Sequence, residues 1–195
     1  MIPIPHVNKG NNQIILHKIR KENIIMAKKN PIIKITVRDL GEMTAELYPD
    51  KAPITVANFL KLIGKNFFEG LIFHRVIKGF MIQGGGYTEE MEHKETDSIK
   101  GEFRANGFMQ NDLKHTRGVL SMARTSDPDS ASSQFFVMHK DAPHLDAQYA
   151  GFGKLTDGFD VLDAIAATPT GSYGWYMQDV PRSPIVIEKV EVISK

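Results

Sequence analysis

The residues best suited to chemistry lie in one short stretch, Phe73–Gly85. Arg75 stands there among apolar neighbours in a strand-like pattern, and Phe80, Met81 and Gln83 follow within eight positions. A guanidinium stays charged near neutral pH and does not exchange its proton, so it can act as a fixed hydrogen-bond donor. The stretch therefore predicts a cation beside an apolar floor. From these residues alone, a binding site and an ordinary strand pair with a solvent-reaching arginine remain open.

Other motifs that could carry chemistry are incomplete. The triplet Gly84–Gly86 is not followed by the Lys-Ser/Thr of a phosphate-binding loop, and Glu89 stands where a dinucleotide fingerprint needs its third glycine. The seven histidines include no HExxH motif, so we expect no metal site. Ser132–Ser133 lack the glycines of a nucleophile elbow. We expect no cofactor either.

Composition narrows the class of protein. The chain has 195 residues, 42% of them hydrophobic and 24% charged, which suits one globular domain. Its net charge of +1 gives no sign of a broad basic face, so we expect no nucleic-acid partner. There is no cysteine and no apolar run approaching the ~18 residues of a membrane span, so we expect a cytoplasmic protein without a membrane segment.

The charge is concentrated at the start of the chain. Residues 1–30 carry six basic side chains and one acidic one, whereas the remainder is net acidic. Met26–Lys29 resembles a natural chain start, so residues 1–25 are interpreted as an upstream addition. We expect residues 1–30 to be a flexible basic extension and residues 31–195 to be the domain, with a basic targeting arm as the alternative.

Short strand-like segments separated by turn residues begin at Ile32. The apolar spacing and proline of residues 53–63, ended by Gly64, predict a helix, and a second is expected over 159–166 with Asp157 as its cap. Strands are expected over residues 32–37, 43–48, 71–76, 80–83, 118–123, 134–138, 149–155 and 185–193. About eight strands and two helices without βαβ alternation favour a mainly β, antiparallel barrel or sandwich.

Several separated motifs, in order along residues 31–195, resemble the cyclophilin family of peptidyl-prolyl cis-trans isomerases, with the bacterial single-domain branch as the closest likeness. They are Phe73–Gly85, Gly118–Ala123, Ser132–Phe136, His144–Asp146 and Phe152–Lys154. The resemblance implies a closed eight-stranded antiparallel β-barrel capped by two helices, with a proline-binding groove on its outer surface. It also implies isomerisation of X-Pro bonds and assistance to protein folding, without a cofactor.

The resemblance also assigns residues to the site. Arg75 matches the catalytic arginine, whose guanidinium faces the prolyl nitrogen. The pocket for the proline ring is expected to comprise Phe80, Met81, Phe136, Leu145 and Phe152. The groove that holds the peptide is expected to include Gln83, Ala123, Arg124, Gln134, His144 and Tyr149. Because isomerisation needs no proton transfer, we expect His74 to be structural.

Three site residues depart from the family pattern. His144 stands where many members have tryptophan, Tyr149 where many have histidine, and Arg124 where asparagine is frequent. The tryptophan contacts the macrocycle cyclosporin in the family, so weakened cyclosporin binding is expected. The expected partners are proline-containing peptides and unfolded proteins, bound by a monomer. A proline-peptide binding module, or a chaperone with incidental isomerase activity, is the alternative function.

Overall fold

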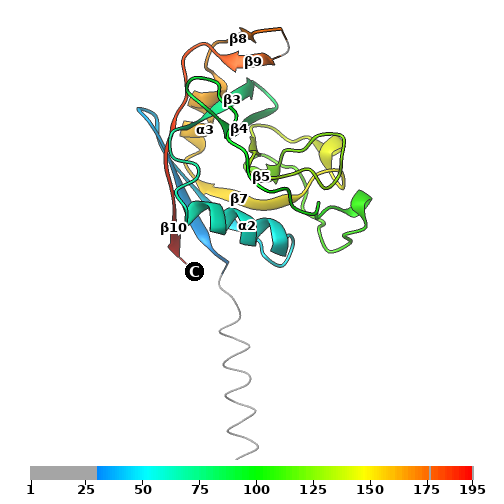
Figure 1. Ribbon diagram of the computed structural model, residues 1–195. Helices are drawn as coiled ribbons and strands as arrows, with labels where there is room; N and C mark the ends of the chain where they lie inside the picture. Colours follow the sequence, from blue (N-terminus) through cyan, green and yellow to red (C-terminus); the bar gives the residue numbers. More distant parts are fainter. Residues whose placement is uncertain (1–29, 176, 195) are drawn as a thin grey trace, which may run out of the picture.

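The computed structural model describes residues 30–175 and 177–194. One antiparallel sheet of eight strands, in the order β10-β1-β2-β7-β5-β6-β4-β3, curls around a large apolar core (Figure 1). Its strands are β1 (Ile32–Val37), β2 (Gly41–Leu47), β3 (Leu71–Ile77), β4 (Met81–Thr88), β5 (Val119–Met122), β6 (Phe135–Met138), β7 (Gly151–Asp157) and β10 (Ile187–Ser194). The predicted mainly β, antiparallel, eight-stranded architecture is confirmed.

Strands β1 and β2 form the hairpin that their alternation predicts. In β1 the side chains of Ile33, Ile35 and Val37 are buried, and those between them are half-buried. This follows because successive strand side chains point to opposite faces of the sheet. The turn passes through Asp39 and Gly41, whose φ angles are 61° and 116°, in the left-handed region that glycine adopts freely and aspartate tolerates.

Two helices, α2 (Pro53–Ile63) and α3 (Phe159–Ala166), complete the fold and have the predicted bounds (Figure 1). The buried apolar side chains of both helices belong to the large core. The predicted cap of α3 is wrong by one residue. Gly158 is the N-cap, with φ 81°, and the Asp157 carboxylate accepts a hydrogen bond from its N–H at 2.8 Å.

The first turn of α2 is bound by a buried carboxylate. Glu102 has no exposed surface, and its two oxygens accept hydrogen bonds from the N–H of Ile54 at 2.9 Å and from the N–H of Thr55 at 2.7 Å. The Thr55 hydroxyl donates a third bond at 2.8 Å. The first N–H groups of a helix have no partner within it, and the helix dipole favours an anion there. Glu102 therefore supplies what the helix start lacks.

The barrel is not fully closed, which corrects the expectation of a closed barrel. The outer strands β3 and β10 share no ladder. Only an isolated bridge, Ile72 with Val186, spans the seam, with flanking bonds from the Phe73 N–H to the Ile185 carbonyl and from the Gly70 N–H to the Ile187 carbonyl. Pro184 offers no N–H just before this segment, so the pairing cannot be extended there.

A hairpin that sequence analysis did not predict follows α3. It consists of β8 (Thr170–Tyr173) and β9 (Met177–Pro181), which form a separate two-stranded sheet whose β9 strand contacts β3. Figure 1 shows the hairpin at the end of the molecule away from α2. It brings a second chain segment close to Arg75.

Two further predictions concern the chain as a whole. The basic extension predicted for residues 1–30 lies outside the described residues, except for Asn30, whose side-chain amide donates to Glu46 at 3.1 Å. Within residues 30–175 and 177–194, the helices are too short and polar to span a bilayer.

Candidate active site

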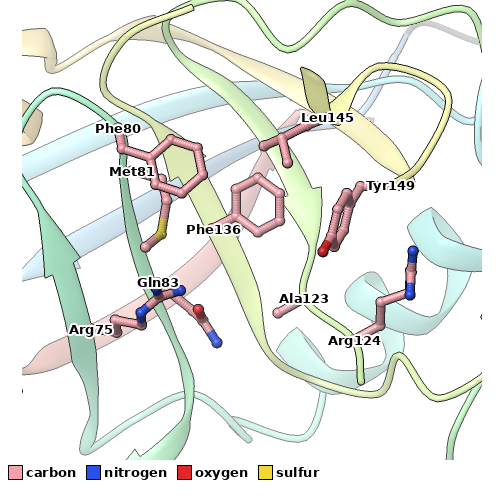
Figure 2. A pocket seen from close by; sticks show the side chains of 9 residues that line it. All are labelled: Arg75, Phe80, Met81, Gln83, Ala123, Arg124, Phe136, Leu145 and Tyr149. Atoms are coloured by element: carbon pink, nitrogen blue, oxygen red, sulfur yellow. The ribbon is translucent and has the colours of Figure 1, made fainter. Parts of the chain in front are cut away.

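A pocket of about 310 Å³ lies on the outer surface of the sheet, and every residue lining it was predicted to belong to the site. Its walls come from β3, β4 and β6, from the turn between β3 and β4, and from the segments that follow β5 and β6. Figure 2 shows Arg75 and Gln83 together at one side, Phe136 in the middle and Arg124 at the opposite side. The lining residues are Arg75, Phe80, Met81, Gln83, Ala123, Arg124, Phe136, Leu145 and Tyr149.

The apolar part of the pocket is a small core of its own, on the outer face of the sheet. Strand alternation explains it, since Phe135 points into the barrel whereas its neighbour Phe136 points out toward Met81 and Leu145. The residues Met81, Phe136 and Leu145 are only 2%, 5% and 8% exposed. They therefore form a firm, water-poor surface that a small apolar ring could contact.

Phe136 is supported from below by a residue that sequence analysis missed. The ring of His115 stacks on it, with centroids 6.1 Å apart and planes 22° apart. Nδ1 of His115 lies 3.2 Å from an oxygen of Asp146, and Nε2 lies 3.0 Å from the hydroxyl of Ser121. Ser121 has no exposed surface, so this Ser-His-Asp order cannot act as a hydrolytic triad; it fixes the ring beneath Phe136.

The polar part of the pocket is built on paired strands. Arg75 of β3 lies opposite Gln83 of β4 in the ladder, and its side chain is 43% exposed. The Gln83 side-chain amide donates to Gln134 at 3.0 Å, which holds both amides in place. Gln134 does not line the main pocket; it lines two adjoining cavities that share Gln83 with it.

The two arginines of the pocket differ in what they bind. The Arg124 guanidinium donates to the carbonyls of Gln148, at 3.0 and 3.3 Å, and Thr125, at 2.8 Å, and lies over the Tyr149 ring at 4.7 Å. Arg75 has one charged partner among the described residues, a carboxylate 3.8 Å away. Arg75 is therefore the arginine with donors free for a ligand.

Two more residues of the predicted site, Phe152 of the proline pocket and His144 of the peptide groove, lie outside this pocket. Phe152 has no exposed surface and packs against Phe59 inside the barrel, with ring centroids 5.0 Å apart. The prediction that it contacts the proline ring is wrong, because its position in β7 turns its side chain inward. His144 does not line the pocket, but it stacks on the outside of Phe80 at 5.7 Å.

His74, the neighbour of Arg75, is buried and packs against the ring of Tyr87 at 4.7 Å. Its Nδ1 has no hydrogen-bond partner among the described residues. Burial, with the nearby positive charge of Arg75, lowers the pKa of His74 from 6.5 to about 4. The ring is therefore neutral at physiological pH, which supports a structural role.

The lowered pKa of His74 predicts acid sensitivity of the fold. In the unfolded chain the residue takes up a proton below pH 6.5, whereas in the folded protein it does so only near pH 4. The unfolded state binds more protons in this window, so the free energy of unfolding should fall by about 3 kcal/mol as the pH drops through it. Denaturant unfolding of wild type and His74→Gln at several pH values measures this; parallel stability curves would contradict the assignment.

The glycines of the triplet Gly84–Gly86 are required by the backbone geometry of β4. A Cβ on Gly84 would lie 2.9 Å from the Ile72 carbonyl oxygen, and Gly85 has φ 83°. The triplet lets β4 pass close to its neighbours. Within the part of the chain that the structure describes, no three His, Cys, Asp or Glu side chains gather in a way that could hold a metal ion.

The family described as "Cyclophilin type peptidyl-prolyl cis-trans isomerase/CLD" matches residues 32–192. The chain belongs to the cyclophilin family. A peptidyl-prolyl cis-trans isomerase of Acinetobacter baylyi is 48% identical over 162 residues, covering 80% of this chain and 82% of the relative. Peptidyl-prolyl cis-trans isomerase B of Escherichia coli is 44% identical over 161 residues, covering 78% and 94%.

Solved cyclophilin structures support the same family assignment. A cyclophilin type peptidyl-prolyl cis-trans isomerase of Cryptosporidium parvum superposes with a TM-score of 0.71 at 30% identity, covering 86% of this chain and 99% of the other. The same protein in the presence of the dipeptide Ala-Pro gives 0.69 at 31% identity, covering 84% and 99%. The protein is therefore a cyclophilin-type peptidyl-prolyl cis-trans isomerase.

Proposed function

We propose that this cyclophilin accelerates rotation about X-Pro bonds with Arg75 as its catalytic residue and the outer pocket as the seat of the proline ring. The observation that carries the proposal is the arrangement of the pocket. A guanidinium with free donors stands at one side, and the apolar floor of Met81, Phe136 and Leu145 lies next to it (Figure 2). A proline has a matching shape: an apolar ring joined to an amide nitrogen.

The chemistry needs no bond to be made or broken. Rotation about the X-Pro bond faces a barrier of about 18–20 kcal/mol because the amide is stabilised by resonance. In the twisted state the prolyl nitrogen becomes pyramidal and regains a lone pair that accepts a hydrogen bond. A donor held at Arg75 binds that state more strongly than the planar amide, which is the condition for lowering the barrier.

The apolar floor of the pocket supplies the remaining part of the barrier lowering. One preorganised donor contributes roughly 2.7–4 kcal/mol. Fixing the ring while the preceding residue turns adds the benefit of orientation, and the buried side chains of the floor keep water from the rotating bond. Gln83 and Gln134 support the peptide backbone in this proposal, because their amides are already aligned by their mutual hydrogen bond.

Exchange spectroscopy on a short proline peptide tests the activity directly. The cis and trans forms interconvert in tens to hundreds of seconds without a catalyst. With protein at a small fraction of the peptide concentration, we expect interconversion to become fast enough to give exchange cross-peaks. Their absence at every protein concentration, with the peptide nonetheless bound, would leave the binding module as the function.

The rate should not depend on pH between 6 and 9. Arginine does not titrate in this range, and the pKa of His74 lies near 4, so neither group changes charge. The isomerisation rate measured across this range is expected to be flat. A sigmoid centred near the ~6.5 of free imidazole would show that a histidine takes part.

We propose the domain boundaries and partners as follows. The isomerase domain spans residues 31–195, is preceded by a basic extension over 1–30, and acts as a monomer. Its substrates are proline-containing peptides and unfolded proteins.

With His144 behind Phe80 in place of a tryptophan, cyclosporin binds weakly. The lack of cysteine supports a cytoplasmic location.

A further inference from the structure

The hairpin β8–β9 places an acidic side chain beside Arg75. An oxygen of the Asp179 carboxylate lies 3.8 Å from Nε of Arg75, and the two side chains are 39% and 43% exposed. Strand β9 contacts β3, the strand that carries Arg75, although the hairpin belongs to a separate sheet. The two charges thus come from elements about a hundred residues apart in the sequence and meet at the edge of the pocket.

The backbone conformation at Asp179 is compatible with this contact. Its φ of 61° lies in the left-handed region, which aspartate and asparagine tolerate better than most residues. The β8–β9 ladder changes register between Gly171 and Tyr173, on the strand facing it. The next two residues of β9, Val180 and Pro181, are buried, so the strand is anchored directly after Asp179.

The position of the carboxylate on the Arg75 guanidinium determines which donors remain available for a ligand. The carboxylate lies near Nε, at the base of the group, so the two terminal nitrogens remain available for a ligand. A long, half-exposed arginine side chain otherwise loses considerable rotamer freedom when it is ordered. A carboxylate at Nε orders the guanidinium beforehand without occupying the donors at its tip.

We infer that Asp179 is a positioning residue that holds the Arg75 guanidinium toward the pocket. This rests on the proposed role of Arg75. The hydrogen bond from Arg75 to the prolyl nitrogen is strongest in the twisted transition state. Loss of Asp179 should therefore lower kcat more than it changes KM. Because the pair is exposed, it should weaken in salt.

The test compares wild type with Asp179→Asn, which removes the charge and keeps the tolerance for the left-handed backbone. We expect kcat to fall about threefold to fivefold with KM changed less than twofold. In addition, raising the salt to about 1 M should lower the wild-type kcat toward that of the variant, whose own kcat should stay nearly constant. The salt series on wild type needs no variant to fold.

Ser172→Ala is the matched control. Its hydroxyl donates to Gln178 at 2.8 Å within the same hairpin, and Ser172 forms neither a hydrogen bond nor an ion pair with Arg75, so kcat should not change. An unchanged or higher kcat in Asp179→Asn, or an effect on KM alone, would overturn the inference. Arg75→Ala separates the two claims: if it is inactive while Asp179→Asn is normal, only the positioning role fails, whereas an active Arg75→Ala removes the proposed mechanism itself.

Discussion

Replacing Arg75 with alanine is expected to lower the isomerisation rate of a proline peptide by about 10²–10³-fold, while peptide binding changes only a few fold. The loss of one preorganised donor to a developing lone pair is of this size. Binding should persist because the apolar floor of Met81, Phe136 and Leu145 is untouched. Exchange spectroscopy gives the rate, and titration calorimetry with the same peptide gives the affinity.

Two further variants sharpen this experiment. Arg75→Lys keeps the charge but replaces the planar fork with a single ammonium, so it should recover only part of the rate. Arg38→Ala removes another exposed arginine, which pairs with Glu89 at 2.9 Å on a different part of the surface, and should be fully active. Full activity of Arg75→Ala would show that the arginine is not the donor.

The same series distinguishes the alternative functions. A binding module would keep its affinity in Arg75→Ala and show little turnover even in wild type. A chaperone that relies on exposed apolar surface would hold unfolded protein equally well after Arg75→Ala and after Phe136→Ala. The isomerase predicts that catalysis is lost in the first variant while the folded structure, measured by circular dichroism, is unchanged.

Replacing Glu102 with alanine is expected to lower the free energy of unfolding by about 3–4 kcal/mol. The buried N–H and hydroxyl of Thr55 and the part-buried N–H of Ile54 would lose their acceptor, and each unsatisfied buried donor costs roughly 1–3 kcal/mol when no water replaces it. For a domain of this size the melting temperature should fall by about 6–16 °C. Denaturant unfolding and calorimetry measure both quantities.

Glu188→Ala serves as the control, because Glu188 is exposed on β10 and its removal should change stability by less than about 0.5 kcal/mol. Glu102→Gln should lie between the two, since its single carbonyl oxygen can accept only part of the three bonds. A loss below about 1 kcal/mol in Glu102→Ala would mean that water or another group satisfies the start of α2. The folded variant should isomerise at the normal rate, because Glu102 does not line the pocket.

Local patterns were enough to predict most elements. The alternation of Ile33, Ile35 and Val37 marks β1 because burial on one face imposes a period of two. Apolar spacing and a leading proline likewise mark α2. The boundaries are less exact where a strand continues through glycine, as in β4, which extends to Thr88 although the pattern suggested an end at Gln83.

The errors share a physical cause. Phe152 was placed in the pocket because it stands in a matching motif, but which face of a curled sheet a side chain reaches depends on the register of β7 against β2 and β5. His115 was missed because nothing in its neighbours shows that it will lie under Phe136. The hairpin β8–β9 had turn residues, Ser172 to Gly174, that could have marked it.

The sequence by itself determined the two α-helices, the eight strands of the main sheet, the net charge of +1 and the identity of the residues around the pocket, because these follow from composition, from short-range periodicity and from motifs read along the chain. Only the tertiary structure decided that the barrel is incompletely closed, that Phe152 faces inward and that Asp179 meets Arg75. Such contacts join segments far apart in sequence. They depend on how strands align and curl, and no local pattern specifies the distance between two distant side chains.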